Sequence, residues 1–206
     1  MSGAGFYVRA PALARGRQRG VALVSALFVM LALTMTALAV ARIAFDAERS
    51  ARAGRDRQLA FQAAEAGLAD AQRDIDGGDN PASARAALFH DDGALGFVAG
   101  CGRAPDNLGL CAFVPGAAPA WQVADAVATT PYGRYTGAIL PYDGALPLAP
   151  PRYLIERMPV AQAGEDAGPG QPHVFRITAF GYGIGPGTLV VLQAVYRGAA
   201  AAPGQS

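Results

Sequence analysis

The residues from Val21 to Ala41 contain no charge, no Gly and no Pro, and this run constrains the fold of the chain more than any other feature. As an α-helix, the run is about 31 Å long, which matches the hydrocarbon core of a bilayer. Its only polar side chains are Ser25, Thr34 and Thr36, whose hydroxyls can donate hydrogen bonds to the preceding helical turn. The run is therefore predicted to span a membrane.

Charge is distributed unevenly around this run. The first 20 residues carry four Arg and no acidic residue, whereas the remaining chain carries 13 Arg and 16 Asp or Glu. Because basic residues stay on the cytoplasmic side, everything after Arg42 is expected on the other side of the membrane, in the periplasm or outside. Without its first 20 residues the chain is mildly acidic, so no nucleic-acid partner is expected.

Three interpretations of the N-terminal region remain open. Ala37, Leu38 and Ala39 form the A-x-A site of a cleaved secretory signal, although the apolar run is longer than the usual ~7–15 residues of such a signal. The run could instead be an uncleaved signal anchor. In the third interpretation, a basic leader ends at Gly20 and is cleaved before Val21, so that the apolar run begins the mature chain.

The apolar run is predicted to continue as one helix to Ile75. Residues 42–75 contain no Pro and are mainly helix formers, which gives a helix of about 80 Å in all. The helix is expected to stop at residues 76–81, where Gly77, Gly78 and Pro81 end helices. An apolar stripe recurs at steps of three and four, and polar residues such as Asp70 are expected on the other faces. The stripe consists of Phe61, Ala64, Leu68, Ala71 and Ile75.

The rest of the chain is predicted to form a small antiparallel sheet, which gives an α+β fold. Alternating segments at 152–158, 173–182 and 188–197 are the expected strands, and residues 183–187 should connect the last two as a hairpin. The second half of the helix should lie across this sheet through Phe61, Leu68 and Ile75. Two segments rich in Pro and Gly, 132–148 and 161–172, are expected to be surface loops, and residues 198–206 are expected to be disordered.

Cys101 and Cys111 are predicted to form a structural disulfide, because the head is expected in an oxidising compartment. Their spacing is not that of a redox motif, and zinc binding would need further ligands, for which only His90 and His173 are available. The loop between the cysteines could also present a partner surface.

The remaining polar groups do not form a recognisable catalytic motif. Asp74, Asp76 and Asp79 lie near two glycines but lack the register of a calcium loop, so solvated carboxylates at a helix end are expected. Glu65 is expected to be solvated, with pairing to Arg57, Arg73 or another subunit as the alternative, and Trp121 is expected to lie in the core. No enzyme activity, cofactor or metal is predicted.

Two stretches resemble a known family. They are RGVALVSAL at 19–27 and RDRQLAFQAAEAGLADAQ at 55–72, and the segment FQAAEAGL at 61–68 is the more diagnostic part. Two C-terminal segments, FRITAFGYG at 175–183 and VVLQAVY at 190–196, are also similar. Together they resemble the PilX-type minor pilins of the type IV pilus over about half of the chain. The resemblance implies a type IV pilin-like fold, cleavage by prepilin peptidase between Gly20 and Val21, and N-methylation of Val21.

The resemblance also implies a domain organisation. Residues 1–20 would be the leader, 21–41 the membrane and filament-core helix, 42–76 its amphipathic continuation, 77–197 the periplasmic head and 198–206 a tail.

Two positions depart from the pattern of major pilins, whose first mature residue is usually Phe or Met, whereas this chain has Val21. Their fifth mature residue is usually Glu, which pairs with a neighbouring subunit's terminal amine, whereas this chain has Ser25. In this respect the chain resembles pilin subunits that are assigned to the filament tip and also lack the Glu. The resemblance therefore implies a minor pilin that helps to start pilus assembly and sits at or near the tip.

The implied partners are other minor pilins, the major pilin, a tip adhesin, the inner-membrane assembly platform and prepilin peptidase. The implied location is the inner membrane and then the pilus tip. A minor pseudopilin of type II secretion, or a single-pass anchored periplasmic binding module, are the alternatives.

Overall fold

A computed structural model of the chain describes residues 21–123, 125–140, 147–160 and 173–197. By their internal contacts the residues fall into two units, 1–51 and 52–206, which are described separately below. The predicted leader at 1–20, the predicted loop at 161–172 and the predicted tail at 198–206 lie outside the described residues.

The long helix predicted from the sequence is confirmed. Helix α1 comprises Val21–Ile75. It stops where Gly77 and Gly78 adopt φ of 109° and 58°, a backbone region that favours glycine. There the Gly78 N–H donates to the Arg73 carbonyl at 2.8 Å, which satisfies one of the free carbonyls of the last turn.

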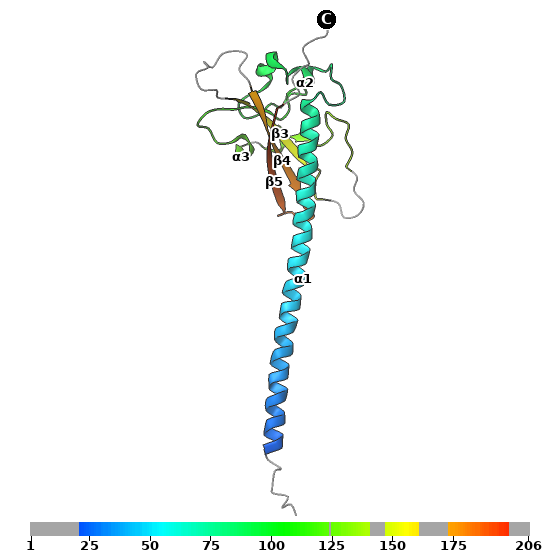
Figure 1. The fold of residues 1–206 in the computed structure, drawn as a ribbon, viewed down its shortest axis with the longest axis vertical. Helices are drawn as coiled ribbons and strands as arrows, with labels where there is room; N and C mark the ends of the chain where they lie inside the picture. The colour runs from blue at the N-terminus through cyan, green and yellow to red at the C-terminus, as the bar shows by residue number, and fades with distance from the viewer. Residues whose placement is uncertain (1–20, 124, 141–146, 161–172, 198–206) are drawn as a thin grey trace, which may run out of the picture. The chain divides into compact units, whose positions relative to one another are not determined.

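Five strands form one sheet in the second unit (Figure 1). They are β1 (Leu110–Ala112), β2 (Thr130–Pro131), β3 (Arg152–Pro159), β4 (His173–Tyr182) and β5 (Leu189–Tyr196). The three strands predicted from alternation correspond to β3, β4 and β5, and the predicted hairpin connects β4 to β5. The described residues of the loop predicted at 132–148 contain no helix or strand.

The sheet is antiparallel as predicted from β2 through β3 and β4 to β5, and one edge strand, β1, departs from this pattern. The strand order is β1-β3-β4-β5, with β2 also pairing with β3. Strand β1 runs parallel to β3, with Leu110 opposite Ile155. Parallel neighbours need a long crossover, and the chain between β1 and β3 provides it, including α3 (Ala120–Val123) and the 3-10 helix Ala126–Ala128.

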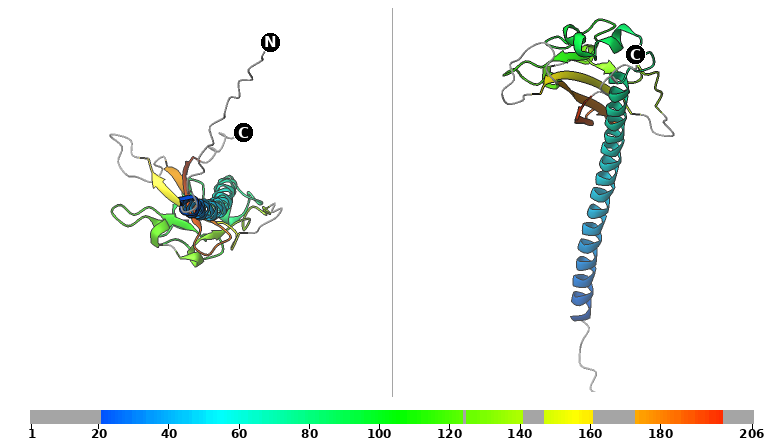
Figure 2. Two further views of the ribbon diagram at one scale, coloured as in Figure 1. Left: turned by 90° about the horizontal axis from the view of Figure 1, so that it is seen from below. Right: turned by 45° about the horizontal axis from the view of Figure 1, so that its top comes forward.

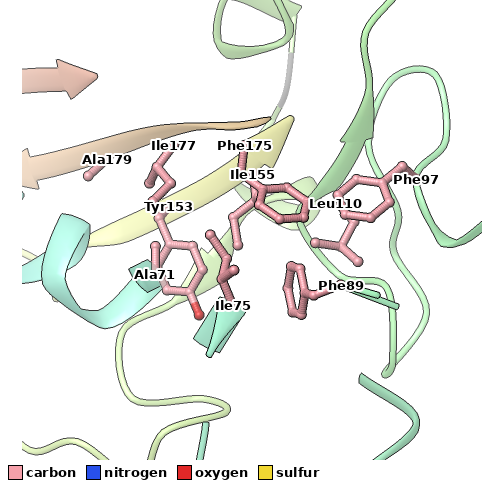
Figure 3. Close-up of a cluster of buried hydrophobic side chains, with 10 residues drawn as sticks. All are labelled: Ala71, Ile75, Phe89, Phe97, Leu110, Tyr153, Ile155, Phe175, Ile177 and Ala179. Atoms are coloured by element: carbon pink, nitrogen blue, oxygen red, sulfur yellow. The ribbon is translucent and has the colours of Figure 1, made fainter. Parts of the chain in front are cut away.

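The second half of α1 packs on one face of the sheet, here called the helix face (Figures 1 and 2). The main core lies between them (Figure 3) and also receives Phe89 and Phe97 from the segment that follows α2 (Ala84–Ala87). Its members are Ala71, Ile75, Phe89, Phe97, Leu110, Tyr153, Ile155, Phe175, Ile177 and Ala179.

A second cluster covers part of the opposite face of the sheet, here called the distal face. Leu154 of β3 lies there with the two cysteines, and Trp121 packs against the cluster. Trp121 is therefore a partly buried core residue, as the sequence predicted.

The packing face of α1 differs in part from the predicted stripe. Ala64, Ala71 and Ile75 are buried as expected, and Leu68 packs against the main core. Phe61 is 39% exposed, so its predicted place on the sheet is wrong, and Ala60 is buried instead. The helix and the sheet approach each other more closely than the predicted stripe implied. A Cβ added to Gly181 of β4 would lie 2.0 Å from the Ala60 carbonyl oxygen.

Two carboxylates of α1 are also buried. Asp70 and Asp74 are 0% and 1% exposed, although the sequence placed Asp70 on a polar face and left Asp74 in solvent. Both predictions are wrong because the head supplies polar partners for these carboxylates, as the next subsection describes.

Candidate functional site

The first candidate surface is the N-terminal part of α1, residues 21–51. Every large apolar side chain from Val21 to Phe45 is at least 52% exposed. Exposed apolar patches of this size mark a membrane or an interface with other proteins. By length and composition this part of α1 can cross a membrane, which fits a single-pass anchor.

The hydroxyl groups of this surface are satisfied within the helix. Ser25 Oγ donates to the Ala22 carbonyl at 3.0 Å, and Thr34 Oγ1 donates to the Leu31 carbonyl at 2.8 Å. Thr36 donates to the two carbonyls at positions 32 and 33. The first carboxylate along α1 is Asp46, so the surface from 21 to 45 offers a neighbouring helix no negative side chain.

The segment FQAAEAGL at 61–68 has two different faces. Ala63, Ala64 and Gly67 are buried against the head, and a Cβ on Gly67 would lie 3.3 Å from the Ala179 Cβ. Phe61 and Glu65 are exposed on the other side of the helix. The small residues hold the helix close to the sheet, whereas Phe61 and Glu65 are available to another molecule.

Three carboxylates of α1, and a fourth directly after its end, fasten separate parts of the head. The first, Asp56, accepts hydrogen bonds from the Thr188 hydroxyl and from the backbone N–H groups of Ile184 and Gly185. These donors, Thr188 first and then Ile184, lower the pKa of Asp56 below its ordinary value of 3.8. Asp56 therefore ties the β4–β5 hairpin to α1.

The other end of β5 is tied to the end of α1. The Tyr196 hydroxyl donates to Asp76 Oδ2 at 2.7 Å. This hydrogen bond raises the pKa of Tyr196 above its ordinary value of 10.0, because the neutral phenol is the donor. The start of β5 is thus fastened through Thr188 to a carboxylate of α1, and its end to a carboxylate directly after α1.

Asp74 is the centre of a buried network. Arg85 donates to both of its oxygens, at 3.2 and 2.6 Å, and the Tyr153 hydroxyl donates to Oδ2 at 2.9 Å. Burial, and then the negative charge of Asp74, raise the pKa of Tyr153 well above 10.0. Asp74, Arg85 and Tyr153 expose at most 4% of their surfaces, so this ion pair is part of the core.

Arg85 connects this network to the loop closed by the disulfide. Its Nη1 donates to the carbonyls of Asp106 and Leu108 at 3.2 and 2.8 Å, and its guanidinium lies 4.2 Å from the centre of the Tyr135 ring. The Tyr135 hydroxyl donates to the Pro105 carbonyl. The 101–111 loop is therefore fixed against the end of α1.

Asp70 holds a third segment. Its Oδ2 accepts the Gly133 N–H at 2.7 Å, and its Oδ1 accepts the Thr136 hydroxyl. The turn at 133–136 is therefore fastened to α1 at a point between the Asp56 and Asp74 contacts.

The predicted disulfide is present. Cys101 and Cys111 are bonded to each other and are 5% and 0% exposed. Their sulfur atoms are therefore not zinc ligands, and His90, one of the two histidines that the sequence offered as further ligands, is exposed. Among the described residues no three Asp, Glu, His or Cys side chains are grouped as a metal site.

Sequence reasoning missed the role of Arg85. The available signal was its isolation, because it is the one charged residue between Pro81 and Phe89. An Arg in an apolar stretch is buried only with a partner, but nothing in the linear sequence indicated which acid it would meet.

A long apolar N-terminal helix, whose second half packs on a C-terminal sheet, defines a pilin-like protein. The family model for the N-terminal region of PilX matches residues 19–69, and the model described as the C-terminal region of the type IV pilus assembly protein PilX matches residues 76–198. The chain belongs to the PilX family of type IV pilus assembly proteins.

This membership assigns the chain to a family of structural pilus proteins rather than enzymes, and to contact with other pilus components. No curated protein and no solved structure matches the chain significantly.

Proposed function

We propose that this chain is a minor pilin that helps to initiate type IV pilus assembly and resides at or near the pilus tip. The observation that carries the proposal is the absence of a carboxylate from the apolar surface of α1, where Ser25 holds a neutral hydroxyl bonded to its own helix. A subunit without this carboxylate cannot neutralise the terminal amine of a neighbouring subunit. It is therefore suited to an end of the filament rather than its interior.

Maturation is the first step of the proposed function. Prepilin peptidase cuts between Gly20 and Val21, and Val21 becomes the N-methylated first residue. The match of the N-terminal family model, which includes both residues, supports this cut. The intact mass of the purified protein tests it: a methylated chain starting at Val21 is expected, whereas a chain starting at Met1 or near Val40 would contradict it.

The proposed mechanism is association through surfaces. The apolar part of α1 first lies in the inner membrane, with the head in the periplasm, and then packs against other pilin helices in the filament. Both surroundings are apolar, so the transfer avoids exposing the helix to water. The expected partners are the major pilin, other minor pilins, a tip adhesin and the inner-membrane assembly platform.

Replacing Ser25 tests the tip position. Ser25→Glu supplies the missing carboxylate, and Ser25→Gln is the matched control because it has similar size and no charge. The glutamate variant is expected to change pilus number, length or tip composition, as seen by electron microscopy and immunolabelling, while the glutamine variant does not. If both variants give wild-type pili, the absence of the carboxylate does not determine placement.

Deletion of the gene tests the role in initiation. Surface piliation is expected to fall sharply while the major pilin remains in the membrane, as measured by shear preparation and membrane immunoblots. Normal pili in the deletion strain would count against the proposed function.

A further inference from the structure

Strand β5 forms one edge of the sheet and differs from the edge strands of most soluble proteins. It pairs with β4 over all eight of its residues, and among the described residues no strand pairs with its other side. The edge strands on the opposite side of the sheet, β1 and β2, have only three and two residues. The β5 edge is therefore the long edge of this sheet.

The backbone groups that point away from β4 follow from the hairpin. The Gly183 N–H donates to the Thr188 carbonyl at 2.9 Å. Antiparallel ladders alternate between bonded and non-bonded pairs, and the β4–β5 register has no bulge. Every second residue from Val190 onward is therefore bonded to β4. The N–H and C=O groups that face outward belong to Leu189, Val191, Gln193 and Val195.

The side chains of the same four residues lie on the distal face of the sheet. Leu189 and Val195 are 51% and 68% exposed, while Gln193 donates to the Thr178 hydroxyl at 3.0 Å. The other four residues of β5 face the helix, and Val190 and Leu192 pack against Ala60 and Ala64 of α1. The free backbone groups are thus bordered by exposed apolar side chains at both ends of the strand.

Natural edge strands are usually protected by charges, Pro or bulges, because an unprotected edge pairs with other chains. Residues 189–196 read LVVLQAVY and contain no charge, Pro or Gly. Asp56 of α1 also holds Thr188, directly before β5, and Asp76, directly after α1, holds Tyr196 at the end of β5. The edge is therefore presented as a fixed template. Such a template binds an extended segment by adding it to the sheet as a further strand.

We propose that the β5 edge binds an extended, uncharged, apolar segment of another protein of the pilus assembly by strand addition. The uncharged edge favours a segment without charges, whose apolar side chains would lie beside Leu189 and Val195. The inference depends on the proposed function only in placing the segment in a pilus protein.

A second copy of this chain fits the edge less well. Antiparallel pairing of β5 with itself would relate the two copies by a two-fold axis perpendicular to the sheet. The second halves of their α1 helices would then run in opposite directions, whereas two chains anchored in one membrane enter this helix from the same side.

The test uses the purified full chain in detergent micelles and a synthetic peptide that copies residues 189–196, with two lysines at each end for solubility. The control peptide has Pro at two adjacent central positions, which blocks both of its edges. Binding is measured by fluorescence anisotropy, and hydrogen exchange of single backbone amides by NMR. The copied peptide is expected to bind and to slow exchange of the four outward amides at least about tenfold. The control peptide is expected not to bind.

Two variants of the chain complete the test. Val191→Pro removes one outward N–H and leaves the bonds to β4 in place, and Val191→Thr is its matched control. Because Pro could distort the strand, Val195→Lys supplies a second variant that adds a charge to the edge without changing the backbone. Val191→Pro and Val195→Lys are expected to weaken peptide binding at least about tenfold, and Val191→Thr to leave it unchanged.

Several results would overturn the proposal. One is no peptide binding at millimolar concentration, and another is binding that leaves the four outward amides unprotected. Protection of these amides in the isolated chain, by a second copy or by residues 198–206, would also overturn it. All these results concern the purified protein, so they can be told apart from a failure of the pilus phenotypes that test the proposed function.

Discussion

The buried pair between Asp74 and Arg85 gives the sharpest prediction on stability. The two side chains are 1% and 4% exposed and are joined by two hydrogen bonds. Arg85→Met removes the guanidinium and fills similar space. Among the described residues, the Tyr153 hydroxyl is then the one remaining donor to the buried Asp74 carboxylate. Breaking one side of a buried pair costs about 3–5 kcal/mol, and the bonds to the carbonyls of residues 106 and 108 are lost as well.

The double variant separates the pair from simple packing. Asp74→Leu combined with Arg85→Met removes both charges, and such replacements are often neutral or stabilising by about 1–4 kcal/mol relative to the ion pair. The double variant is therefore expected to be more stable than either single variant. The coupling energy from this cycle should exceed about 2 kcal/mol.

The assay is urea unfolding of the full chain in detergent, followed by the fluorescence of Trp121. This residue is the only Trp in the chain and packs in the head, so the signal reports on the second unit. The matched control is Arg103→Met, because Arg103 pairs with Asp125 while their side chains are 59% and 54% exposed. The control should cost less than about 1 kcal/mol. A cost below about 1 kcal/mol for Arg85→Met would refute the reasoning.

Three further predictions concern other contacts of the head. The ionised Asp56 carboxylate stabilises the hairpin contact, since its pKa is lowered in the folded state. This stabilisation is complete when the pH is above the ordinary pKa of 3.8, and it is lost as the pH falls through the lowered folded-state pKa. Acid titration of the Ile184 amide by NMR should show this loss, and Asp56→Asn should remove the titration. Reduction of the Cys101–Cys111 disulfide should lower the free energy of unfolding by roughly 3 kcal/mol, and unchanged urea midpoints would contradict this. Gly181→Ala should destabilise the head because the new Cβ would lie 2.0 Å from a helix carbonyl oxygen. The new Cβ of Gly54→Ala would meet no atom within 4 Å, so this variant should stabilise α1 by up to about 1 kcal/mol. Equal melting temperatures for the two variants would refute the comparison.

The sequence by itself determined the apolar part of α1, the length of the helix, the three long strands and the disulfide. These features depend on properties visible in the sequence: an uncharged run, the absence of Pro, alternation along a strand, and two cysteines in a head expected in an oxidising compartment. The three-residue strand β1 has too few positions for alternation to be visible, and its parallel partner β3 lies about 40 residues away along the chain, so the mixed character of the sheet came from the tertiary structure.

Only the tertiary structure decided which face of α1 meets the head and which carboxylates enter the core. The helix is rich in Ala, so a stripe through Phe61 and one through Ala60 differ little in hydropathy, and the close approach of Gly181 to Ala60 favours the smaller residue. Asp70 and Asp74 are polar by sequence, yet both are buried because Gly133, Thr136, Arg85 and Tyr153 meet them from distant positions. Burial of a charge depends on partners that only the folded chain brings together.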